Sequence, residues 1–120
     1  MRAARLGALA ALGVLVAGSC VSERAATGPD NGCASGTVEI SIQGYAFSDT
    51  DVCVRPGTTV VWTNREANDR HTTTSDTGVW DSGLLSTGQQ YSRRFTAEGT
   101  FPYHCTPHPT MRGRIVVRDD

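Results

Sequence analysis

Residues 103–117 read YHCTPHPTMRGRIVV, and this segment gives the clearest indication of both fold and chemistry. A thiol, an imidazole and a thioether follow one another at intervals of three residues, at Cys105, His108 and Met111. Groups spaced in this way can converge on one ion from a single tight loop. Pro107 and Pro109 restrict the backbone of that loop, so the predicted ligands are held in place with or without a metal.

The donor types in this loop indicate copper. A cysteine thiolate, two imidazoles and a weak thioether form the ligand set of a blue-copper site, and His71 is the one histidine outside the loop. Structural zinc prefers four strong nitrogen or sulfur donors, so a thioether favours copper over zinc. Met111 could instead be a packing residue. His104 precedes Cys105 in a predicted strand and should point to the opposite face, so we interpret it as structural.

The chain on the N-terminal side of this loop has the pattern of short strands. Val38, Ile40 and Ile42 alternate with polar residues, as do Tyr91, Arg93 and Phe95. Turn-forming residues separate the runs, and no stretch combines helical periodicity, capping and length. About six to eight short strands joined by Gly and Pro turns predict an antiparallel β-sandwich. The expected runs are 38–42, 51–55, 58–64, 91–95, 100–105 and 115–117.

Residues 103–117 resemble the copper loop of amicyanins, which are plastocyanin-like cupredoxins. The short Cys-x2-His-x2-Met spacing is of the amicyanin type, since plastocyanin has a longer gap before its Met. The similarity extends to residues 60–66, His71-Thr72, 80–85 and 95–105, so it covers nearly all of residues 37–118. It implies an all-β Greek-key β-sandwich of the cupredoxin type, with about seven to eight strands. It also implies one copper ion, Cu+ or Cu2+, bound by His71, Cys105, His108 and Met111.

The same resemblance assigns roles to residues around the ligands. Thr72 is expected to donate its backbone N–H to the sulfur of Cys105, and Asn64 is expected to fix the ligand loops by hydrogen bonds. His108 is expected to lie near the surface in an apolar patch with Pro107 and Pro109, where its exposed edge would be the electron port. Departures from the family pattern are Thr110, the charged approach to the first histidine at residues 68–70, and Cys33 with Cys53.

The N-terminal residues 1–19 have the pattern of a secretory signal. A short basic start is followed by an apolar run over residues 6–16, which is too short to span a membrane comfortably. The small residues at its end fit an ordinary cleavage site, or a lipoprotein signal in which Cys20 becomes the lipidated first residue. We favour the lipoprotein signal, followed by a flexible tether over residues 20–36 and a cupredoxin domain over residues 37–118.

The remaining cysteines fit an exported protein. Cys33 and Cys53 have no His or Met close by and are predicted to form a disulfide, which would stabilise the fold by roughly 3 kcal/mol. Cys105 is then the thiol left over, and its neighbours explain it as a ligand. The predicted location is the periplasm or the outer face of the cell membrane, with a lipid anchor.

Composition and motifs restrict the function. The formal net charge is −1 and no basic stripe is present, so nucleic acid is not an expected partner. No nucleophile–base pair or nucleotide-binding loop is evident, which favours a carrier over an enzyme. We predict a monomeric blue-copper protein that shuttles single electrons. Expected partners are redox proteins such as a c-type cytochrome, a dehydrogenase or a respiratory-chain component. The alternative is an extracytoplasmic copper-binding or delivery protein without a redox-shuttle role.

Overall fold

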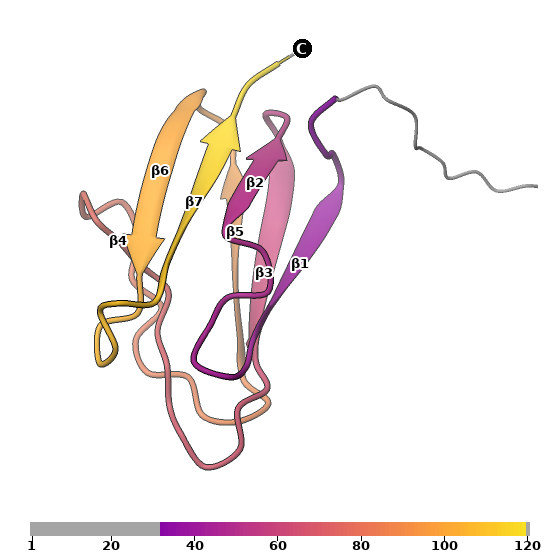
Figure 1. The fold of residues 1–120 in the computed structure, drawn as a ribbon. Coiled ribbons are helices and arrows are strands. Elements are labelled where there is room, and N and C mark those ends of the chain that lie inside the picture. The colour runs from indigo at the N-terminus through magenta and orange to yellow at the C-terminus, as the bar shows by residue number, and fades with distance from the viewer. Residues whose placement is uncertain (1–31, 120) are drawn as a thin grey trace, which may run out of the picture. The chain divides into compact units, whose positions relative to one another are not determined.

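A computed structural model describes residues 32–119, which form seven strands in two sheets (Figure 1). No helix occurs within that range, and so none that is long and apolar enough to cross a membrane. The two sheets face each other around a shared core, as expected of a β-sandwich. The all-β prediction is therefore confirmed.

The three-stranded sheet has the order β1-β3-β5. It comprises β1 (Thr37–Ile42), β3 (Thr58–Asn64) and β5 (Gln90–Phe95). β1 runs parallel to β3, and β5 runs antiparallel to β3. Val60 and Trp62 on β3 are fully buried because alternate residues of a strand share one face of the sheet.

The four-stranded sheet has the order β2-β7-β6-β4. Its strands are β2 (Asp51–Val54), β4 (Thr74–Ser75), β6 (Gly99–His104) and β7 (Arg112–Val117). β6 and β7 are antiparallel, and so are β4 and β6. β6 ends just before the loop 105–111 and β7 begins just after it. Because these two strands are paired, the two ends of the loop lie side by side.

The expectation of an antiparallel sandwich is wrong for two strand pairs. β1 pairs in parallel with β3, and β2 pairs in parallel with β7. The alternation of apolar and polar residues reports which face of a strand is buried, but it carries no information about the direction of the neighbouring strand. The alternation pattern therefore could not predict that these two pairs are parallel.

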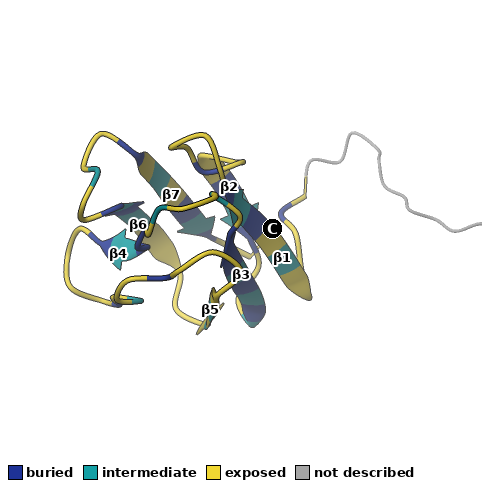
Figure 2. Cartoon of the chain, turned by 90° about the horizontal axis from the view of Figure 1, so that it is seen from below, coloured by how far each residue is buried: buried dark blue, intermediate teal, exposed yellow. Residues whose placement is uncertain are grey.

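The core between the sheets is rich in aromatic side chains. Trp62 is in ring contact with Trp80, Tyr91, Phe95 and Tyr103, at centroid distances of 5.4–6.5 Å. Buried and exposed residues alternate along β1 and β7, as the banding of these strands in Figure 2 shows. The aliphatic part of the core comes from both sheets and comprises Ile40, Ile42, Val52, Val54, Val60, Leu85, Ile115 and Val117.

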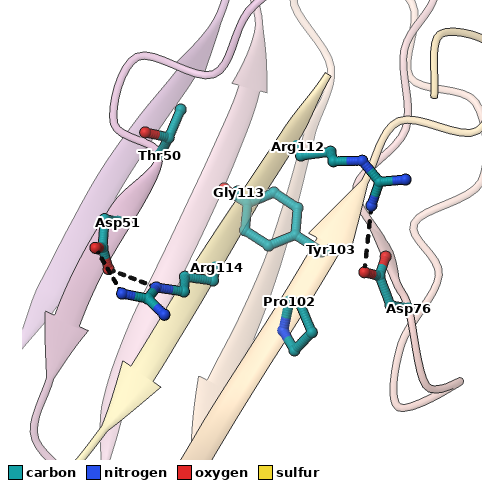
Figure 3. A pocket seen from close by; sticks show the side chains of 8 residues that line it. All are labelled: Thr50, Asp51, Asp76, Pro102, Tyr103, Arg112, Gly113 and Arg114. Carbon is teal, nitrogen blue, oxygen red and sulfur yellow. Dashed lines mark hydrogen bonds and ion pairs between the residues drawn. The ribbon is translucent and has the colours of Figure 1, made fainter. Parts of the chain in front are cut away.

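Gly113 on β7 faces Tyr103 on β6, and the two residues are paired in the sheet (Figure 3). A Cβ atom at position 113 would lie 2.6 Å from the hydroxyl oxygen of Tyr103 and 2.7 Å from its Cζ. At distances this short, any side chain at position 113 would have to displace the Tyr103 ring. The glycine therefore makes room for the fully buried Tyr103 ring, which lies two residues before Cys105.

Residues 33–36, at the end of the predicted tether, contact the folded domain. Ala34 donates its N–H to the carbonyl of Cys53 at 3.0 Å, and its carbonyl accepts from Arg55 N at 2.7 Å. Cys33 and Cys53 form the predicted disulfide, which holds this segment beside β2. The sequence pattern missed this attachment because one residue paired beside a strand produces no periodicity.

The predictions for the N-terminal region fall on residues 1–31, outside the described part of the chain. They comprise the signal over residues 1–19, lipidation of Cys20 and most of the tether over residues 20–36.

Candidate metal centre

Three predicted ligands meet at one end of the sandwich. The Sγ atom of Cys105 lies 3.6 Å from Nδ1 of His71 and 3.7 Å from Nδ1 of His108. The donor atoms of all three residues lie within 4.8 Å of one another. Bonds of about 2.3 Å to sulfur and about 2.0 Å to nitrogen, about 120° apart, require donors about 3.7 Å apart. The observed spacing therefore fits one metal ion bound by all three residues.

The loop that carries Cys105 and His108 is closed by its own backbone. Cys105 N donates to the carbonyl of Met111 at 3.1 Å, and Met111 N donates to the carbonyl of His108 at 2.9 Å. His108 N donates to the carbonyl of Cys105 at 3.2 Å, and the prolines at 107 and 109 restrict the remaining freedom. Met111 is buried at the end of this loop, immediately before β7.

His71 comes from a separate segment, between β3 and β4. It pairs with Leu85 through two backbone hydrogen bonds of 3.2 and 2.8 Å. Its side chain is fully buried, whereas 28% of the side-chain surface of His108 is exposed. One imidazole of the site is thus closed off from solvent and the other reaches the surface.

Thr72 ties the two ligand segments together. Its backbone N–H donates to Sγ of Cys105 at 3.4 Å, and its Oγ1 accepts from the backbone N–H of Thr106 at 2.8 Å. A thiolate accepts such a hydrogen bond well, because the donated N–H offsets its negative charge. Thr72 therefore places a hydrogen-bond donor at the sulfur of Cys105 and links it to the segment that carries His71.

Asn64 links the loop that precedes His71 to the segment around Leu85. Its Nδ2 donates to the carbonyls of Leu85 at 2.7 Å and Asp69 at 2.9 Å, and its Oδ1 accepts from Glu66 N at 2.8 Å. Asn64 is itself fully buried. One side chain consequently fixes three backbone positions in two loops.

Two residues that the sequence analysis did not single out also contact the ligands. Oε1 of Glu66 lies 3.2 Å from Nε2 of His71. The ring of Tyr45 lies edge-on to both imidazoles, with centroids 5.4 Å from His71 and 5.0 Å from His108. Glu66 lay within the segment that resembles amicyanins, but a charged residue in a turn is ordinarily solvent-exposed. Tyr45 follows β1 in a loop whose path the alternation pattern does not predict.

Carboxylates lie beside both imidazoles. Asp69 Oδ2 lies 3.9 Å from Nε2 of His108 and accepts a hydrogen bond from the Tyr45 hydroxyl. That hydrogen bond lowers the pKa of Asp69 and raises the pKa of Tyr45. The backbone N–H of Tyr45 is the largest cause that lowers the pKa of Glu66, followed by the N–H of Gly44 and the contact with His71. Both carboxylates are therefore ionised at neutral pH.

His104 does not join the donor group. Its Nδ1 lies 2.5 Å from Oδ1 of Asp76, whose other oxygen is 3.6 Å from Arg112. This cluster lies near the end of β6, and Figure 3 shows Arg112 reaching Asp76 there. The neighbour of Cys105 in the sequence thus forms a hydrogen bond with a different part of the chain.

The surface beside His108 combines apolar and polar groups. Pro107 and Pro109 are exposed, and a shallow pocket next to Pro107 is lined by Thr72, Asp81, Gly83, Leu84 and Thr106. Leu84 keeps 52% of its surface exposed. The exposed edge of the site is therefore bordered by apolar side chains from two loops.

Comparisons with known proteins agree with this geometry. The family model described as copper binding proteins, plastocyanin/azurin family, matches residues 34–118. Amicyanin-alpha of Methylorubrum extorquens is 35% identical over 119 residues, which cover 96% of this chain and 94% of that protein. Amicyanin of Paracoccus denitrificans is 38% identical over 89 residues, covering 70% and 67%. A solved structure of a mutant amicyanin in its Cu(I) form aligns with a TM-score of 0.65 at 38% identity, covering 71% of this chain and 85% of that one.

The chain therefore belongs to the copper-binding proteins of the plastocyanin/azurin family. Within that family it is similar to amicyanins, as the copper loop predicted, and its cofactor is one copper ion.

Proposed function

We propose that this protein is an exported blue-copper electron carrier in which His71, Cys105, His108 and Met111 hold the copper. The observation that carries the proposal is the group formed by two Nδ1 atoms 3.6 and 3.7 Å from a buried cysteine sulfur. The Thr72 N–H directed at that sulfur supports a thiolate there. Membership of a copper-binding family and the similarity to amicyanins support the same function.

Bound copper supplies the exchange of one electron between Cu+ and Cu2+. The protein holds the donors in one arrangement through the closed 105–111 loop, Thr72 and Asn64. A preformed site reduces the rearrangement that each transfer requires, because the donors need not move between oxidation states. Burial of His71 and Cys105 excludes water from the inner side of the site. These features fit a carrier better than an enzyme that must admit a substrate.

His108 is the proposed route for electrons. It is the ligand whose side chain reaches solvent, and the exposed Pro107 and Pro109 adjoin it. An apolar surface around the exposed histidine suits brief contacts with other redox proteins, because removing water from apolar groups costs little free energy. We expect the partners to be a c-type cytochrome, a dehydrogenase or a respiratory-chain component.

Export and anchoring form a separate part of the proposal. The Cys33–Cys53 disulfide supports an oxidising compartment, the periplasm or the outer face of the cell membrane. A lipid on Cys20 would hold the protein at the membrane. Replacing Cys20 by Ser should move the protein from the membrane fraction to the soluble extract. An unchanged distribution, with no lipid found on the N-terminal peptide by mass spectrometry, would exclude the anchor.

The central test is spectroscopic. Visible and electron paramagnetic resonance spectra of the Cu(II)-loaded protein should show an intense blue thiolate-to-copper band and narrow copper hyperfine splitting. Both should be lost in the C105S variant. A pale spectrum that the substitution leaves unchanged would instead favour copper binding or delivery without a redox shuttle.

A further inference from the structure

Glu66 lies against the face of His71 that points away from the predicted copper. Nδ1 of His71 faces the sulfur of Cys105, and Nε2 lies 3.2 Å from Oε1 of Glu66. The side chain of Glu66 keeps only 13% of its surface exposed. A carboxylate in this position, together with the imidazole and a metal, forms the arrangement by which proteins orient metal-binding histidines.

Two consecutive residues in the left-handed conformation hold this carboxylate in place. Gly44 and Tyr45 have φ angles of +65° and +57°, and their consecutive backbone N–H groups donate to Glu66 at 3.1 and 2.8 Å. Successive N–H groups that converge in this way form a concave site for an anion. The left-handed conformation is unfavourable for a tyrosine, so the structure bears strain at Tyr45 where it fixes the carboxylate.

The backbone of Glu66 is also fixed on both sides. Its N–H donates to Oδ1 of Asn64 at 2.8 Å, and its carbonyl accepts from the hydroxyl of Thr87 at 2.5 Å. The carboxylate therefore has little freedom to leave His71. An ionised group that cannot move acts on a neighbouring site as a fixed charge.

We propose that Glu66 is a positioning residue that fixes the tautomer of His71 and stabilises oxidised copper. Its carboxylate accepts a hydrogen bond from Nε2–H, which leaves Nδ1 unprotonated with its lone pair free to bind the metal. Its negative charge interacts more favourably with Cu2+ than with Cu+, which lowers the reduction potential. The effect on copper rests on the proposed ligand set, whereas the effect on the tautomer does not.

The first test replaces the charge but not the shape. The copper-loaded E66Q variant should shift the equilibrium toward reduced copper about tenfold, which is about 59 mV for a one-electron couple. E98Q removes the same charge from the exposed turn between β5 and β6 and serves as the control. A potential for E66Q that moves no further than that of E98Q, in a protein that is still blue, would overturn the inference and leave the proposed function intact.

The second test needs no copper, and its first part uses the unaltered protein. Long-range proton–nitrogen NMR of the metal-free protein at about pH 8, where histidine is ordinarily neutral, identifies the tautomer of His71. The Nε2–H form is expected, and in E66Q it should give way to a mixture of tautomers. The Nδ1–H form in the unaltered protein would exclude the role of Glu66, even if E66Q fails to fold. A wild-type protein that lacks the blue spectrum would contradict the proposed function, and this measurement would still decide the hydrogen bond.

Discussion

The copper-binding end of the sandwich and its aromatic centre solve the problem of buried polar groups in different ways. At the copper end, Asn64, His71, Thr72 and Thr73 are buried, and each takes part in side-chain hydrogen bonds. In the centre, three buried polar atoms in the described part of the chain have no hydrogen-bond partner, namely Trp62 Nε1, Tyr103 Oη and Arg93 Nε. The copper end is thus held by directed polar contacts and the centre by packing.

This difference reflects what each region must do. A metal site needs atoms held in one geometry, and hydrogen bonds supply direction. A core is held mainly by the area it buries, and large aromatic rings supply much of that area here. Substitutions of polar groups should therefore be costly at the copper end and mild in the centre, whereas changes of volume should be costly in the centre.

Asn64 should give the largest effect. N64A removes two hydrogen bonds to loop carbonyls and one from the Glu66 N–H, of which the bond to Leu85 is buried and the other two are partly buried. Unpaired buried groups cost about 1–3 kcal/mol each, so we expect a loss of about 3–4 kcal/mol in the free energy of unfolding. Urea denaturation measures this loss, with Q43A in an exposed loop as the control. A loss no larger than that of the control would remove the distinction between the two regions.

Gly113 should give the next largest effect, through volume rather than polarity. G113A places a methyl group 2.6–3.0 Å from atoms of the Tyr103 ring, which Trp62, Trp80 and Phe47 confine. Overpacking of this kind costs about 1–3 kcal/mol. Denaturation of G113A beside the G113A/Y103F double variant tests the cause. The double variant should recover part of the loss, and equal losses would show that the Tyr103 hydroxyl is not the obstacle.

The two regions also differed in how far the sequence predicted them. Cys105 and His108 were predicted to converge because their spacing within one loop is a local property of the chain, whereas His71 was added as the one histidine outside that loop, and the structure brings the three side chains together. Glu66 and Tyr45 could not be predicted, because their contacts depend on the path of the loop after β1, which left-handed residues set. The parallel pairing of β1 with β3 was missed for a related reason, since strand direction depends on tertiary contacts that no local pattern encodes.

Tyr103 offers a smaller effect of opposite sign. Y103F removes a buried hydroxyl that lacks a hydrogen-bond partner in the described structure, and the ring remains in place. Removing an unpaired buried hydroxyl should offset the loss of its packing contacts. The free energy of unfolding should therefore stay within about 1 kcal/mol of the unaltered protein or rise. A calorimetric comparison of the two melting temperatures measures this. A clear fall would indicate that the hydroxyl is hydrogen-bonded after all, and the core would then resemble the copper end.

The smallest effect is expected at Asp51, on the exposed side of β2. Its carboxylate accepts two hydrogen bonds from Arg114, at 3.0 and 2.9 Å, and these lower the pKa of Asp51 (Figure 3). A carboxyl group whose pKa is lowered by folding stabilises the folded state above its ordinary pKa of about 3.9, and this contribution is lost as the pH falls further. Solvent screens an exposed pair, so D51N should change stability at pH 7 very little.

The acid dependence of stability can then be divided between the two regions. Folding also lowers the pKa values of Glu66 and Asp69, and both carboxylates lie beside the imidazoles of the copper end. We expect the E66Q/D69N double variant of the metal-free protein to reduce the loss of stability between about pH 5 and about pH 3 more than D51N does. Urea denaturation at both pH values measures this difference. An equal reduction would mean that acid acts on exposed pairs throughout the domain, and that the polar contacts at the copper end contribute no more than an ion pair on the outer surface.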